Sequence, residues 1–153
     1  MTDHRDSQFL RWGLLLVLLV AAVLRLGALP DLPLGLHYDE AANLILTRQI
    51  VEDGYRPLFI RAYTGKEVLF FYMAAPWVWM TGGSPWGLRL GAAMLGVMTV
   101  AATFAAVRVL LPGRAERSQV ALFAAGWMAL AFPHVLLSRY GFRAISQPLL
   151  QAL

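Results

Sequence analysis

Three apolar runs in the sequence are each long enough to cross a lipid bilayer as a helix. They cover about residues 12–29, 88–111 and 119–137. About 20 apolar residues span the hydrocarbon core, and only a helix satisfies its own backbone hydrogen bonds there. The composition agrees, since 59% of the residues are hydrophobic and 14% are charged, against about 25% charged in a soluble domain. We therefore expect an all-α, polytopic integral membrane protein.

Several functional classes are excluded or lose support at once. The sequence has no cysteine, which excludes disulfides, a thiol nucleophile and a thiolate metal site. The net charge is +4, but the basic residues flank the apolar runs. They are therefore expected to orient helices in a membrane rather than to bind nucleic acid. No metal-ligand spacing and no phosphate-binding glycine loop is present. No cofactor is indicated with certainty, and a divalent metal stays an open alternative.

The two ends of the chain lead to two expectations. Residues 12–29 follow basic residues, as in a secretory signal peptide, but the apolar run is longer than a signal requires and no small-residue cleavage site follows. We prefer an uncleaved signal-anchor helix to a cleaved peptide. Residues 144–153 begin another apolar run of about two helical turns. We therefore expect the N-terminal part of a longer membrane protein, inactive by itself.

A fourth apolar run, residues 68–80, either spans the membrane or lies at its surface. It is short, contains Pro76 and is rich in aromatic residues, which favour the headgroup level. If it spans, two groups of arginines fall on opposite sides of the membrane, whereas if it lies flat both are cytoplasmic. We prefer the second arrangement. It predicts a multi-pass protein of the plasma (inner) membrane with a cytoplasmic N-terminus. Residues 30–86 then form an extracytoplasmic loop with amphipathic juxtamembrane helices.

This loop holds six of the nine acidic residues: Asp31, Asp39, Glu40, Glu52, Asp53 and Glu67. Residues 39–53 read as a helix with carboxylates in the first turn and Gly54 after the end. Asp39, Asn43 and Thr47 form a polar stripe along it, and such a helix is expected to lie along the membrane surface.

Asp39 and Glu40 have a functional and a structural interpretation. A carboxylate can accept a proton from an acceptor hydroxyl, so Asp39 can act as a general base. Acidic residues also favour any first helical turn, where they cap the helix or complement its dipole. Adjacent side chains on a helix point in different directions. One carboxylate can therefore face a cavity while the other caps the helix or pairs with a cation.

Charged residues near the ends of the apolar runs leave similar alternatives. Arg139 and Arg143 are four residues apart, so they share a face if the helix continues, and two guanidinium groups on one face suit a phosphate. Alternatively, each arginine extends to lipid headgroups by itself. Arg25 either pairs with a loop carboxylate or contacts a lipid phosphate. We expect His134 to be packed or interfacial rather than a metal ligand.

The order of motifs resembles the N-terminal part of the type-C membrane glycosyltransferases, in their protein O-mannosyltransferase and aminoarabinose-transferase-like branch. The motifs are His37-Tyr38-Asp39-Glu40-Ala41, Gly65-Lys66, Trp86-Gly87-Leu88-Arg89-Leu90 and Ser138-Arg139-Tyr140-Gly141-Phe142-Arg143. The resemblance covers essentially the whole chain, but only the first third of such a protein. The sequence departs from it after Gly65-Lys66, where Glu67-Val68-Leu69 replaces Pro-Pro-Leu, and after Arg143, where no acid follows.

The resemblance implies a single integral membrane glycosyltransferase domain, of which residues 1–153 are the N-terminal part. It implies a polyprenyl-phosphate sugar as donor and an acceptor hydroxyl of a lipid, glycan or protein, outside the cytoplasm. Asp39 would be the catalytic base with Glu40 beside it, and Lys66, Arg139 and Arg143 would lie near the donor phosphate. The rival interpretations are a transporter or flippase for an anionic lipid or lipid-linked sugar, and a non-enzymatic membrane subunit.

Overall fold

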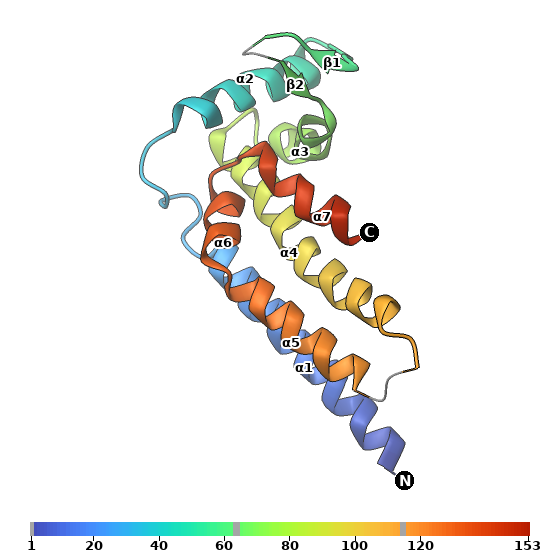
Figure 1. The fold of residues 1–153 in the computed structure, drawn as a ribbon. Coiled ribbons are helices and arrows are strands. Elements are labelled where there is room, and N and C mark those ends of the chain that lie inside the picture. The colour runs from blue at the N-terminus through green and yellow to red at the C-terminus, as the bar shows by residue number, and fades with distance from the viewer. Residues whose placement is uncertain (1, 63–64, 114–115) are drawn as a thin grey trace.

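The computed structural model describes residues 2–62, 65–113 and 116–153. Long helices pack side by side and the smaller elements gather near one end (Figure 1). Helix α1 (Thr2–Leu26) contacts both α4 (Pro85–Leu110) and α5 (Arg117–Leu130), which contact each other. The fold class predicted from the sequence is therefore confirmed in its helical part. One small two-stranded hairpin in the loop between α2 and α3 was not predicted.

Among the described residues, two helical segments are long and apolar enough to cross a membrane. They are Gln8–Leu26, with a mean hydropathy of 2.2, and Pro85–Leu110, with a mean hydropathy of 2.0. Both match predicted spans, although the first helix ends at Leu26 rather than at residue 29. Leu29 is buried in the turn that follows. A third span exists if α5 and α6 (Phe132–Arg139) are counted together. These two or three helices indicate a membrane protein.

The third predicted span is not one straight helix. Helices α5 and α6 meet at an angle of 55° across Ala131. Pro133 is the second residue of α6 and has no backbone N–H, so it cannot donate to the carbonyl of Ala129. Proline in the first turn is well tolerated, and the chain therefore begins a new helix there. The break leaves carbonyls at the end of α5 that need other donors.

Small residues let α4 approach its neighbours closely, as its glycines and alanines predict. Gly96 is the clearest case. A Cβ atom at this position would lie 2.7 Å from the Ser138 Cβ and 2.9 Å from the Arg25 Nε. Any larger residue would push α1 and α6 away from α4. The two helices therefore meet α4 at one position, and Arg25 lies where they converge.

Helix α2 (Tyr38–Glu52), the hairpin and α3 (Leu69–Met80) lie at the end of the bundle away from the N-terminus (Figure 1). The hairpin pairs β1 (Phe59–Ile60) with β2 (Lys66–Glu67) in antiparallel register. Figure 1 looks nearly along α3, whereas α1, α4 and α5 are seen from the side, so α3 crosses them. Its residues Phe70 and Phe71 are fully buried in the core between α2 and α4.

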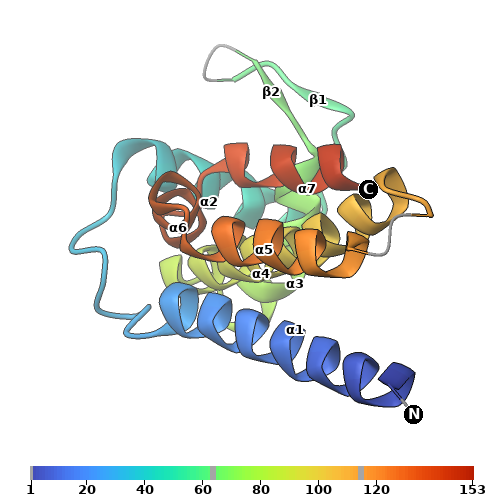
Figure 2. The ribbon, with the colours of Figure 1, turned by 60° about the horizontal axis from the view of Figure 1, so that its bottom comes forward.

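The last segment, residues 143–152, is helical, as the apolar run there predicted. A single 3₁₀ turn, η1 (Arg143–Ile145), precedes α7 (Ser146–Ala152). Helix α7 packs along α4, on the side opposite α1 (Figure 2). Ile145 and Leu149 are fully buried and fix this position. Their burial places the segment that contains Arg143 next to the first turn of α2, at the end of the bundle away from the N-terminus.

Candidate functional site

The first turn of α2 separates the two neighbouring carboxylates. His37 precedes the helix in an extended conformation, and its Nδ1 accepts a hydrogen bond of 3.2 Å from the Asp39 backbone N–H. His37 therefore caps the helix, so the alternative in which Asp39 is the cap is wrong. The carboxylate of Asp39 is exposed, whereas that of Glu40 is fully buried. Both carboxylates lie at the positive end of the helix dipole.

Glu40 forms a buried ion pair with Arg89 on α4. The Arg89 Nε and Nη2 atoms donate to the two carboxylate oxygens over 2.6 and 2.9 Å. The same guanidinium donates to the carbonyls of Pro33 and Gly35, at 2.9 and 2.6 Å. One arginine thus holds both the first turn of α2 and the loop that leads into it. No part of the Glu40 side chain is exposed, and its ion pair with Arg89 holds the turn that carries Asp39.

Asp39 lines a pocket of about 340 Å³ at the junction of three chain segments. The first turns of α2, the strand β2 and the segment around η1 each contribute side chains. The lining residues are Tyr38, Asp39, Ala42, Asn43, Lys66, Phe142, Arg143 and Ala144. A carboxylate and two cations therefore share one pocket, and three of the five predicted site residues, Asp39, Lys66 and Arg143, are brought together.

Asn43 connects these segments, although the sequence analysis assigned it only to a polar stripe. Its Nδ2 donates to the carbonyl of Gly141 over 3.1 Å, and its Oδ1 accepts from the Lys66 Nζ over 3.0 Å. Asn43 is 1% exposed, and Thr47, one turn further, is fully buried. Two of the three members of the polar stripe, Asn43 and Thr47, therefore face the protein interior, while Asp39 is exposed. The sequence offered one sign of this role: the amide of Asn43 can both donate and accept hydrogen bonds without carrying a charge.

Burial gives the two cations of the pocket different environments. Lys66 is 6% exposed, and burial lowers the pKa of its ammonium group, with a smaller lowering from the nearby Arg143. The carboxylates of Asp39 and Glu67 act in the opposite direction on the same pKa. Arg143 is partly exposed and forms an ion pair with Glu67 at the surface. A bound anion can replace Glu67 at small cost, because exposed ion pairs contribute about 0–1 kcal/mol.

Arg139 lies outside the pocket. Helix α6 ends at this residue, and Gly141 follows with a φ of +63°, which turns the chain away from the helix axis. The expectation that Arg139 and Arg143 share a helical face is therefore wrong. The Arg139 guanidinium donates to four backbone carbonyls at the end of α1 and in the turn beyond it, those of Leu24, Arg25, Gly27 and Leu32. It satisfies carbonyls that the helix end leaves without donors.

Arg25 contacts neither a loop carboxylate nor the surface, so both alternatives from the sequence analysis are wrong. Its guanidinium is fully buried and donates to the carbonyls of Met128 and Ala129 over 3.2 and 3.1 Å. Both carbonyls belong to the last turn of α5, where the break before α6 leaves carbonyls without helical donors. A third contact joins Arg25 to the His134 Nδ1 at 2.9 Å. His134 is buried and packed, as predicted.

No group of three His, Asp or Glu side chains suited to a metal ion occurs in the described parts of the chain. Comparison with protein-family models, curated proteins and solved structures found no match. The resemblance to glycosyltransferases consequently stays an expectation from the sequence motifs.

Proposed function

We propose that the protein transfers a glycosyl group from a polyprenyl-phosphate sugar to an acceptor hydroxyl, with Asp39 as the general base. One observation carries this proposal. An exposed carboxylate, Asp39, shares a pocket with two cations, Lys66 and Arg143, and the three come from separate segments of the chain. A base and a phosphate-binding pair are the two requirements of this transfer.

The pocket supports a single displacement at the anomeric carbon. Asp39 accepts the proton of the acceptor hydroxyl, whose oxygen forms the new bond to that carbon as the bond to the phosphate oxygen breaks. The departing polyprenyl phosphate keeps the electron pair. Lys66 and Arg143 stabilise its negative charge through positions fixed before the reaction begins. Attack from the side opposite the leaving group inverts the anomeric configuration.

The remaining predicted residues act at a distance in this proposal. Glu40, held by Arg89, orients the turn that carries Asp39. Arg139 fixes the end of α1 and the turn after it. Both are positioning residues, because neither lines the pocket. No metal ion is required for the chemistry, since the two cations supply the positive charge.

The proposed location follows from the same arrangement. The first turn of α2, the strand β2 and the turn η1, whose residues line the pocket, lie at the end of the bundle away from the N-terminus (Figure 1). With a cytoplasmic N-terminus in the plasma (inner) membrane, the pocket faces the extracytoplasmic side. A donor with a lipid tail can then remain in the bilayer while its phosphate reaches Lys66 and Arg143.

The test is transfer of labelled sugar in membranes that contain the intact protein. The donors are polyprenyl-phosphate mannose and polyprenyl-phosphate aminoarabinose, and extracts of membrane lipid, glycan and protein supply acceptors. We expect Asp39→Asn and Asp39→Ala to lower the rate by about 10²–10⁴-fold, the usual contribution of a general base. Asp31→Asn is the matched control, because Asp31 is exposed in the loop before α2 and does not line the pocket.

Two results would contradict the proposal. Transfer that persists in Asp39→Asn at normal expression excludes Asp39 as the base. Movement of the donor across the membrane without any transfer to acceptor supports the transporter interpretation instead.

A further inference from the structure

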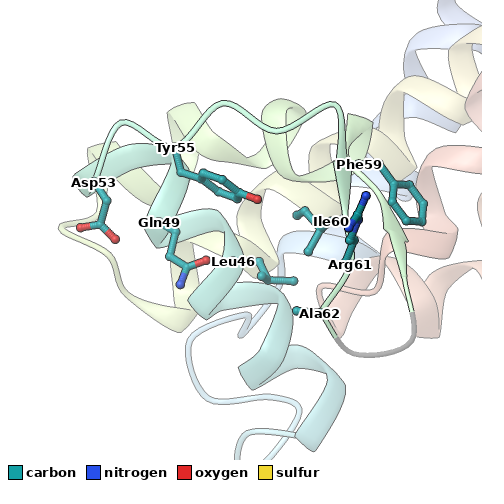
Figure 3. Close-up of a pocket in the computed structure, with 8 residues that line it drawn as sticks. All are labelled: Leu46, Gln49, Asp53, Tyr55, Phe59, Ile60, Arg61 and Ala62. Carbon is teal, nitrogen blue, oxygen red and sulfur yellow. The ribbon is translucent and has the colours of Figure 1, made fainter.

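A second and larger pocket lies further along α2, next to the hairpin. It has a volume of about 600 Å³ and is formed by α2, the loop after it and the strand β1. Its lining residues are Leu46, Gln49, Asp53, Tyr55, Phe59, Ile60, Arg61 and Ala62. Figure 3 shows the ring of Tyr55 extending above α2 toward Ile60, with Gln49 and Leu46 on the helix below it.

Hydrogen bonds hold the walls of this second pocket in place. The Arg56 Nη1 donates to the Ile50 carbonyl over 2.5 Å, which fixes the loop to the end of α2. The Tyr72 hydroxyl on α3 donates to the Pro57 carbonyl over 2.9 Å. Ile60 pairs with Lys66 in the hairpin and is 2% exposed. The pocket is therefore formed before any ligand arrives, as binding sites for small ligands usually are.

The polar side chains of the second pocket are not used by the fold. Gln49, Asp53, Tyr55 and Arg61 make no side-chain hydrogen bond to any other described residue. Together they offer an amide, a carboxylate, a hydroxyl and a guanidinium, which donate and accept hydrogen bonds. The ring of Tyr55, which is 45% exposed, adds a flat apolar face. One carboxylate balances one guanidinium, so the lining favours a neutral ligand.

This set of groups matches a neutral carbohydrate better than a lipid or a phosphate. A sugar ring has an apolar face of C–H groups, which can lie on an aromatic ring, and a rim of hydroxyls that both donate and accept. Leu46 and Ile60 are buried, and four of the eight lining residues carry polar side chains, which suits a ligand rich in hydroxyls better than an acyl chain. The cations suited to a phosphate lie in the pocket of Asp39 instead.

The two pockets lie end to end along one face of α2. Asp39, Ala42 and Asn43 line the first, and Leu46, Gln49 and Asp53 line the second. Successive members of this series are mostly three or four residues apart, the spacing that keeps side chains on one face of a helix. At about 1.5 Å per residue, Gln49 lies about 15 Å along the helix from Asp39. A chain of several sugars can bridge this distance, whereas a single sugar cannot.

We propose that the second pocket binds a neutral oligosaccharide whose terminal hydroxyl reaches Asp39. Its role as the acceptor site rests on the proposed function, but the binding of the oligosaccharide does not. The sugar acceptor then contacts the protein at two places. Its hydroxyls bind Gln49 and Asp53 in the second pocket, and its terminal hydroxyl gives its proton to Asp39 in the first.

The test measures binding of neutral hexose oligosaccharides, two to six units long, to the intact protein in lipid nanodiscs. We expect affinity to rise with length up to the span between the pockets. Tyr55→Ala and Gln49→Ala should each weaken binding by about tenfold, as loss of an anchoring contact does. Leu58→Ala is the matched control, because Leu58 is 94% exposed in the same loop and does not line the pocket. Tyr55→Phe should retain most of the affinity, because it keeps the ring.

The outcomes separate this proposal from the proposed reaction. Asp39→Asn should lower transfer by about 10²–10⁴-fold, while the loss of oligosaccharide binding caused by Tyr55→Ala should be the same with and without it. Binding without transfer in the unmodified protein would refute only the reaction. Binding that is equal in Tyr55→Ala, Gln49→Ala and Leu58→Ala would overturn the oligosaccharide site. A serine-containing peptide that binds with the same dependence on Tyr55, in place of the oligosaccharide, would overturn it as well.

Discussion

The buried ion pair between Glu40 and Arg89 offers the sharpest test of how the pocket is held. The Glu40 side chain has no exposed surface and that of Arg89 is 6% exposed. Removing one member leaves the other charge buried without a partner, which costs about 3–5 kcal/mol. We therefore expect Arg89→Met to lower the free energy of unfolding by that amount. The loss includes the two bonds from Arg89 to the carbonyls of Pro33 and Gly35.

The double variant separates the charge from the packing. Glu40→Leu combined with Arg89→Met removes both charges and leaves two apolar side chains of similar size. Replacing a buried pair in this way is often neutral or stabilising. The double variant should therefore regain most of the stability that either single variant loses, and the double-mutant cycle gives the coupling energy.

The assay is equilibrium unfolding in mixed detergent micelles, followed by tryptophan fluorescence. The matched control is the exposed Arg48–Glu52 pair on α2, the helix that also carries Glu40. Its side chains are 49% and 45% exposed. Removing either of its members should change stability little, because exposed pairs are screened by water. A loss in Arg89→Met as small as that in Arg48→Met would refute the reasoning. So would a double variant as unstable as the sum of the single ones.

Two further predictions concern the other buried cations. Arg25→Met should destabilise the protein by about 2 kcal/mol or more, because buried carbonyls at the break between α5 and α6 lose their donor. Arg11→Met, on the same helix and exposed, serves as the control, and equal losses in the same unfolding assay would contradict the prediction. Because burial lowers the pKa of Lys66, the folded state binds fewer protons than the unfolded state as pH approaches the ordinary lysine value of 10.5. The contribution of Lys66 to the free energy of unfolding should therefore rise with pH in that window, and Lys66→Met should remove this contribution. The same pH dependence of stability in Lys66→Met and in the unmodified protein would contradict the prediction.

The sequence predicted the helices well, because a long apolar run has one structural solution in lipid. Helix α2 was also predicted almost to the residue, since its carboxylates mark the start and Gly54, with a φ of +68°, marks the end. The hairpin was missed because strands of two residues carry too little alternation to be recognised. Only Pro133 indicated the bend after α5. The effect of a proline depends on its position in a helix, so the sequence did not predict the bend.

The site was harder to predict, because its geometry depends on which distant segments meet. Spacing placed Asp39 in the first turn of a helix but could not show that Lys66 and Arg143 reach the same pocket. Arg139 and Arg143 do not share a face, because their spacing aligns side chains only within a continuous helix, and Gly141 interrupts it. The ion pair of Arg89 with Glu40 was not predicted, because Glu40 lies 49 residues earlier in the sequence.

The contacts of Arg25 also set an order of events during membrane insertion. Its partners Met128, Ala129 and His134 follow it by more than a hundred residues. Synthesis delivers α1 to the membrane long before α5 and α6 exist, so during that interval the guanidinium has none of these acceptors. A charged side chain in hydrocarbon costs about 2.5–3.5 kcal/mol even by the lowest scales. We therefore expect nascent α1 to keep Arg25 at the aqueous boundary or against another protein until α5 and α6 supply these acceptors.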